Sequence, residues 1–85
     1  MPKNYDDVNK RFKALVADIM GVKPNTLKDG TRFVEDLHAK SIDTIALTAA
    51  AEGEFKIKLT PGEANRNTTI KKTVDCIVSK MRGRD

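Results

Sequence analysis

Residues 33–44 read Phe33-Val34-Glu35-Asp36-Leu37-His38-Ala39-Lys40-Ser41-Ile42-Asp43-Thr44, and Glu52-Gly53-Glu54-Phe55 follows at helical distance. The pattern predicts a helix from about Ser41 to Phe55, because its apolar residues complete one surface and its Ala-rich middle has high helix propensity. Ile45, Leu47 and Phe55 are expected to belong to the core. Asp43 falls in the first turn, where the helix dipole stabilises negative charge. Ser41 lies at the helix start, where a serine is often the N-cap residue that accepts a backbone N–H.

Two longer helices are predicted on either side of this segment. The first spans about residues 4–20, with Asn4 as its cap and Gly21 as its stop signal. The second is opened by Thr69 and ends in the charged tail 82–85, which we expect to be frayed. Both carry apolar residues at steps of three and four, the spacing of one helix face. These residues are Val8, Phe12, Leu15, Val16, Ile19 and Met20 in the first helix, and Ile70, Val74, Ile77, Val78 and Met81 in the last.

The remaining stretches are expected to be connections and one short helix. Residues 22–40 have no sustained period and predict a long loop. Thr60-Pro61 supplies an N-cap residue and a first-turn proline for a short helix at 61–66. We therefore expect a single all-α domain over residues 1–85, with three longer helices and one short one. The apolar anchors of the long loop are Val22, Leu27, Phe33, Val34 and Leu37.

The composition of the 85 residues narrows the class of protein. Hydrophobic residues make up 39% and aromatic residues only 5%, which predicts an interior of aliphatic side chains. Neither a bilayer-spanning run nor a signal peptide is evident, so we expect a cytoplasmic protein without membrane insertion. Cys76 is the only cysteine and His38 the only histidine, which argues against a disulfide or a metal site and favours a buried structural thiol.

The net charge of +4 and the isoelectric point near 9.4 raise the alternative of a basic helical interaction module that binds nucleic acid. The charge is uneven, however, since residues 33–55 contain five acidic residues and one lysine. The basic residues near the C-terminus lack the interleaved aromatic residues of a recognition surface, and we expect them to form a solvated helix face. They are Lys71, Lys72, Lys80, Arg82 and Arg84.

The segment quoted first resembles the attachment-site region of acyl carrier proteins. In that family the pattern is roughly F-x-E-D-L-G-x-D-S-L-D, followed by a helix that ends in E-E-x-F. The resemblance extends over nearly the whole chain and implies a non-catalytic four-helix bundle with a long loop between the first two helices. The positive net charge makes this chain an atypical, basic member. The matching residues are Phe33, Glu35, Asp36, Leu37, Ser41, Asp43, Glu52 and Phe55.

The resemblance implies that a separate phosphopantetheinyl transferase attaches 4′-phosphopantetheine from coenzyme A to Ser41. The acyl cargo is then held as a thioester on the distal thiol. A phosphodiester at a helix N-terminus also faces unpaired backbone N–H groups and the positive end of the dipole. Expected partners are the transferase and acyl-processing enzymes such as a ketosynthase, dehydratase, reductase or acyltransferase of fatty-acid, polyketide or specialised lipid biosynthesis. The protein itself is expected to be a monomer.

No catalytic residue is assigned. His38, Ser41 and Asp43 are close in sequence, but a catalytic triad is assembled from distant segments beside a substrate cleft and an oxyanion hole. His38 is instead expected to be a solvated loop residue. An aminoacyl or peptidyl carrier shares the fold and the modified serine, and remains an alternative. Such carriers typically have Gly-Gly near the serine, and His38-Ala39-Lys40 does not fit that pattern well.

Residues around Ser41 are expected to recognise the partner enzymes. The resemblance implies that acidic residues on the helix contact basic residues of those enzymes. Lys40 stands where acyl carriers usually have Asp, so one electrostatic contact is reversed. Like charges reject wrong partners, which predicts a specialised carrier insulated from the enzymes of another pathway. The recognition candidates are Lys40, Ile42, Asp43, Glu52 and Glu54.

The residues expected to line an acyl pocket also depart from the family pattern. Ala51 lies where a bulky Leu is usual, and Asn67 lies where an aliphatic residue is usual. These exchanges enlarge or polarise the pocket unless neighbouring side chains fill the space. If the cargo fills it instead, an unusually bulky or polar acyl chain is implied. The pocket candidates are Phe33, Leu47, Ala51, Ala64 and Asn67.

Overall fold

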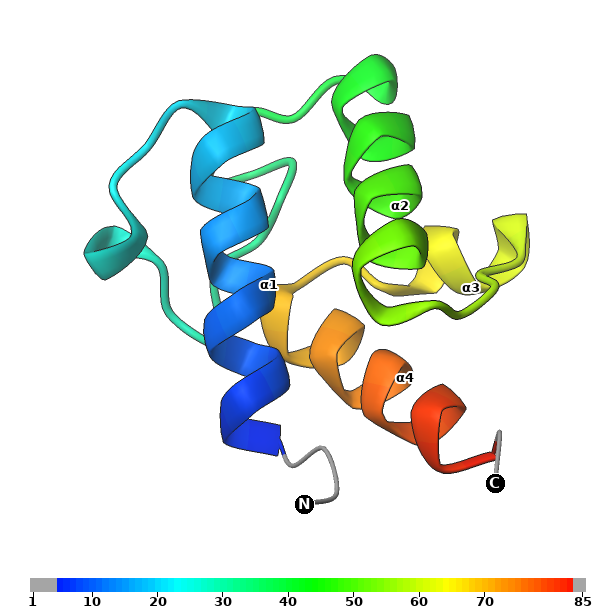
Figure 1. The fold of residues 1–85 in the computed structure, drawn as a ribbon. Coiled ribbons are helices and arrows are strands. Elements are labelled where there is room, and N and C mark those ends of the chain that lie inside the picture. The colour runs from blue at the N-terminus through cyan, green and yellow to red at the C-terminus, as the bar shows by residue number, and fades with distance from the viewer. Residues whose placement is uncertain (1–4, 84–85) are drawn as a thin grey trace.

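The computed structural model of the chain describes residues 5–83 and is all-α, as predicted (Figure 1). The predicted cap Asn4 and residues 84–85 of the predicted tail lie outside the described part. The other two tail residues, Arg82 and Gly83, are helical. Within 5–83, the only extended pairing is an isolated antiparallel bridge between Arg32 and Thr69. The helices are α1 (Tyr5–Met20), α2 (Ser41–Phe55), α3 (Pro61–Arg66) and α4 (Ile70–Gly83), with a short 3-10 helix, η1 (Pro24–Thr26).

Helix α1 packs against both α2 and α4, and α4 also contacts the short α3 (Figure 1). The buried side chains are mostly aliphatic, as the composition predicts, with Phe12 and Phe33 packed edge to face at 6.2 Å between ring centroids. The long loop thus contributes an aromatic ring to the centre of the core. The most completely buried large side chains are Phe12, Ile70, Ile77, Val8, Val16 and Val74.

The helix ends follow the signals in the sequence. Gly21 adopts a φ of 69°, and the N–H of Val22 donates to the carbonyl of Ala17 at 3.1 Å, which closes the end of α1. Thr60 is the N-cap residue of α3, and its Oγ1 accepts the N–H of Glu63. At the start of α4, the N–H of Lys72 donates to Thr69 Oγ1 at 3.1 Å.

The loop between α1 and α2 is more ordered than its sequence indicates. Besides η1, it is fixed by backbone hydrogen bonds from Phe33 N to Thr68 O and from Ile70 N to Thr31 O, each at 3.1 Å. Among the five predicted anchors, Leu27 and Phe33 are buried and two others are half-buried. Val34 is 61% exposed, so its prediction as an anchor was wrong.

The structure also bears on the environment of Cys76 and on the search for a membrane-spanning helix. Cys76 is half-buried rather than buried, although it lies on α4 as the apolar stripe indicated. Across residues 5–83, no helix combines the length and the apolar character required to cross a bilayer.

Candidate functional site

The turn before α2 is held by Asp36 and Arg32. The Asp36 carboxylate accepts the backbone N–H of Arg32 at 2.8 Å and the Arg32 guanidinium at 3.0 Å. The Arg32 hydrogen bonds hold the pKa of the Asp36 carboxyl below its ordinary value. Backbone bonds from Leu37 N to Arg32 O and from Ala39 N to Phe33 O complete the turn. The first half of the motif therefore fixes where α2 begins.

His38 occupies a left-handed backbone conformation with a φ of 57°. The carrier pattern has glycine at this position, and glycine adopts a positive φ without steric cost. Histidine is among the residues that tolerate this region better than most. The side chain is exposed, in agreement with its prediction as a solvated loop residue.

Ser41 is the first residue of α2 and is not its N-cap, which corrects one interpretation of the sequence. Lys40 is the N-cap residue, with an extended backbone, and its N–H donates to Asp43 Oδ2 at 2.9 Å. The Asp43 carboxylate therefore forms the half of a capping box in which the N3 side chain accepts the N–H of the N-cap residue, while the Lys40 side chain itself makes no capping hydrogen bond. Ser41 is exposed and lies beside the first backbone N–H groups of the helix, which have no intrahelical acceptor.

This arrangement suits an anion attached to Ser41 better than catalysis by Ser41. The N–H groups and the positive end of the helix dipole favour a phosphate at that position. Over the described range 5–83, no cluster of three or more His, Cys, Asp or Glu side chains is placed to hold a metal ion. The site therefore offers an exposed serine hydroxyl beside the N-terminus of a helix.

The acidic recognition candidates all interact with other parts of the chain. Asp43 caps Lys40, and Glu52 accepts the backbone N–H of Leu59 at 2.8 Å. Glu54 Oε2 lies 2.8 Å from Arg11 on α1, whose guanidinium also stacks over the Phe55 ring. Each of these carboxylates thus has a hydrogen-bond partner within the molecule, and Glu54 is paired with a positive charge.

The exposed face near Ser41 is apolar instead. Ile42 is 73% exposed and Ile45 is 67% exposed, and both lie on the first turns of α2. The prediction that Ile45 belongs to the core was therefore wrong, while Ile42 is exposed as a recognition candidate should be. Helical spacing placed Ile45 on an apolar face of α2, but it could not show whether another element covers that face.

A groove of about 350 Å³ lies between α2 and α3, and a smaller cavity of about 30 Å³ lies deeper in the bundle. All five predicted pocket residues line the deeper cavity. The structure brings them together from the loop before α2, from α2, and from α3 and its C-cap residue. The groove and the cavity share four lining residues, of which only Ala64 was predicted from the sequence. These are Thr44, Thr48, Leu59 and Ala64.

A signal for two of these residues exists in the sequence. Thr44 and Thr48 follow Ser41 by three and seven positions, a spacing that places all three on one face of a helix. Their polar side chains were not considered as pocket residues. The same face that exposes Ser41 thus leads along the groove toward the core.

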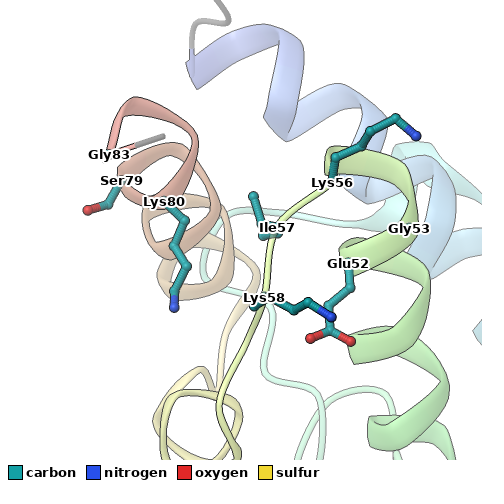
Figure 2. A pocket seen from close by; sticks show the side chains of 8 residues that line it. All are labelled: Glu52, Gly53, Lys56, Ile57, Lys58, Ser79, Lys80 and Gly83. Carbon is teal, nitrogen blue, oxygen red and sulfur yellow. The ribbon is translucent and has the colours of Figure 1, made fainter. Parts of the chain in front are cut away.

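A larger hollow of about 880 Å³ lies elsewhere, between the end of α2 and the end of α4 (Figure 2). Gly53 and Lys56 at the C-terminal end of α2 form one side of it, and Ser79 and Lys80 of α4 form the other. With a rise of 1.5 Å per residue, Ser41 lies roughly 18 Å from Gly53 along the helix axis. The hollow is therefore distant from Ser41, although Glu52 lines both the hollow and the groove.

Two of the C-terminal basic residues are paired with acids. Lys71 lies 2.9 Å from Asp75, and Lys80 lies 2.6 Å from Glu63. These pairs reduce the unmatched positive charge on α4, which weakens the nucleic-acid alternative.

Comparison with known proteins adds a family and a fold. The family described as "Phosphopantetheine attachment site" matches residues 10–77. The solved structure of an acyl carrier protein from Enterococcus faecalis superposes with a TM-score of 0.79 at 22% sequence identity, covering 92% of this chain and 99% of that one. At this identity the similarity concerns the fold.

Proposed function

Because the chain belongs to the acyl carrier family, whose cofactor is a covalently attached phosphopantetheine, we propose that Ser41 is its attachment residue and that the arm carries acyl intermediates as thioesters. In the attachment step, Ser41 Oγ attacks the pyrophosphate phosphorus next to the pantetheine of coenzyme A. An O–P bond forms, the pyrophosphate bond breaks, and adenosine 3′,5′-bisphosphate leaves. The hydroxyl proton passes to a base of the transferase.

The single observation that carries this proposal is the position of Ser41. Its side chain is exposed at the N-terminus of α2, the turn before it is fixed, and the Asp43 carboxylate is occupied by the N–H of Lys40. A phosphodiester there lies next to unpaired N–H groups. Thr44 and Thr48 continue the same helix face into the groove, so an arm on Ser41 starts on the side where an acyl chain finds shelter.

The proposed partners are the transferase and enzymes that process acyl chains in fatty-acid, polyketide or specialised lipid biosynthesis. The exposed side chains of Ile42 and Ile45 offer them an apolar contact close to the arm. Lys40 adds positive charge beside Ser41, and Glu54 of α2 is paired with Arg11 of α1. A partner with an apolar surface and an acidic residue opposite Lys40 fits this face better than a strongly basic one.

The chain offers a matched control for the attachment site, because Ser79 is its only other serine and is exposed on α4. Wild type, Ser41→Ala and Ser79→Ala are each incubated with coenzyme A and a broadly specific phosphopantetheinyl transferase, and intact masses are compared. We expect wild type and Ser79→Ala to gain one phosphopantetheine and Ser41→Ala to gain none. An unmodified wild type, with a known carrier modified in parallel, contradicts the proposal, as does a modified Ser41→Ala.

A further inference from the structure

Asn67 presents a buried hydrogen-bond donor without an acceptor. It is the C-cap residue of α3, and its backbone N–H donates to Glu63 O at 3.1 Å and to Ala64 O at 3.3 Å. Its side-chain Nδ2 is buried, and no hydrogen-bond partner for it is found among residues 5–83. A buried donor without an acceptor is unfavourable, so native proteins rarely retain one without a reason.

The surroundings of this donor are mostly apolar. Phe12, Phe33 and Leu47 line the same cavity, and Ala51 provides only a methyl group there. The hydroxyl of Thr73 donates to the carbonyl of Thr69 at 2.8 Å. The cavity of about 30 Å³ has room for a group the size of a water molecule. An acceptor that enters the cavity can therefore reach a donor that the protein itself leaves unpaired.

A route to this donor leads from the surface near Ser41. The groove between α2 and α3 and the deeper cavity share Thr44, Thr48, Leu59 and Ala64, so they are neighbouring parts of one space. Leu59 and Ala64 line both parts, whereas Asn67 lines only the deeper cavity, so a chain in the groove has to extend inward to meet Asn67. If that chain is purely hydrocarbon, it covers Nδ2 and leaves it unsatisfied.

We propose that Asn67 selects the cargo, and that the chain carried by this protein has a hydrogen-bond acceptor, such as a keto or hydroxyl oxygen, in the part that reaches the cavity. The inference rests on the proposed carrier function of Ser41. It defines the cargo class as oxygenated acyl chains rather than saturated hydrocarbon chains. The small side chain of Ala51 leaves the space in which the oxygen-bearing carbon sits beside the amide.

The test compares thermal stability of the loaded protein. The holo-protein is charged with octanoyl and with chains of the same length that carry one ketone at successive positions, and melting temperatures are measured. In wild type we expect at least one keto chain to exceed octanoyl by about 4 °C or more, which is the shift expected from one net hydrogen bond in a domain of this size. In Asn67→Leu we expect octanoyl to stabilise at least as well as every keto chain.

Two further variants make the comparison decisive. Asn67→Asp has the same shape but no N–H donor, so it should lose the keto preference even if Asn67→Leu folds poorly. Asn25→Leu makes the same exchange at an exposed position of η1 and should keep the preference. Equal stabilisation of wild type by octanoyl and by all keto chains overturns the inference, as does a preference that persists in both Asn67 variants.

The mass measurement tests the proposed function of Ser41, and the melting temperatures test the role of Asn67, so the two proposals can fail separately. If wild type takes up no phosphopantetheine, the mass measurement shows it before any chain is attached, and both proposals fall. If Ser41 is modified and loaded but the keto preference is absent, the carrier function stands and only the role of Asn67 is overturned.

Discussion

At the scale of single residues, the N-cap of α2 and the exposed serine occupy neighbouring positions. Lys40 is the N-cap residue and its N–H is bound by the Asp43 carboxylate, while Ser41 is the first helical residue and is exposed. The sequence predicted a helix start at Ser41 and an acid in the first turn, and both are confirmed. It could not predict which residue caps the helix, because Ser41 and Lys40 differ by one position and helix bounds are uncertain by that amount.

Lys40 allows stability and recognition to be tested separately. Both Lys40→Asn and Lys40→Asp introduce a strong N-cap side chain, so we expect each to raise the free energy of unfolding by about 0.5–2 kcal/mol in urea denaturation. Only Lys40→Asp restores the acid that carriers usually have. With a transferase that prefers acidic carriers, we expect faster modification of Ser41 in Lys40→Asp than in wild type, and little change in Lys40→Asn.

The neutral variant is the control for this comparison. Equal acceleration in both variants would show that a firmer helix start, rather than charge, sets the rate. No acceleration in Lys40→Asp would show that Lys40 does not limit docking, and the prediction of an insulated carrier would then lose its electrostatic basis.

At the scale of elements, the short helix α3 depends on its ends. Six residues are too few for a helix to be stable alone, so capping and contacts with α4 determine its position. Glu63 Oε1 accepts the N–H of Thr60 at 2.8 Å and lies 2.6 Å from Lys80 Nζ. These interactions lower the pKa of Glu63 from 4.5 to about 2, with the Lys80 hydrogen bond as the largest cause.

This shift predicts a pH-dependent contribution to stability. Because the pKa of Glu63 is lower in the folded chain, its contribution is fully present above about 4.5 and is lost as the pH falls toward about 2. We expect Glu63→Gln to unfold at lower urea than wild type at neutral pH, and the difference to shrink as the pH falls through that window. Glu35→Gln makes the same exchange at an exposed loop position, and the prediction fails if both variants show the same pH profile.

Helix α2 shows what periodicity can and cannot determine. Its bounds and the burial of Leu47, Ala51 and Phe55 agree with the spacing of apolar residues. The exposure of Ile45 does not, because an apolar side chain at helical spacing is buried only where another element packs against it. Val34 was misassigned for the same reason, since no element covers that part of the turn closely enough to bury it.

At the scale of the whole molecule, the four predicted helices are confirmed, and their described ends agree to within about one residue except at the C-terminal end of α4, which continues to Gly83 in the stretch expected to be a tail. Strong caps explain this agreement, because Gly21 and Thr60 mark helix ends by local chemistry. The pairing of Arg32 with Thr69 could not be predicted, since it joins residues that are distant in sequence and leaves no local pattern. The four lining residues that the groove and the cavity share could not be predicted either, because they come together only when the helices pack.

The pocket residues illustrate the same limit. The family resemblance located Phe33, Leu47, Ala51, Ala64 and Asn67, and the structure places all of them around one cavity. It did not indicate that Nδ2 of Asn67 lacks an acceptor, because that depends on the directions of hydroxyl and carbonyl groups from three separate segments. The polar lining residues Thr44 and Thr48 were missed because an acyl pocket was expected to be apolar.

The most direct test of a Ser41-borne chain sheltered by the bundle is a comparison of backbone amide chemical shifts, by NMR, between the holo-protein and its octanoyl form. We expect the largest changes at residues that line the groove and the cavity, such as Thr48, Ala64 and Asn67, and little change around Lys56 and Lys80 at the hollow distant from Ser41. Changes confined to Ser41 and its immediate neighbours would show that the chain stays in solvent. Changes centred on Lys56 and Lys80 would place the chain elsewhere, and either result would contradict the account.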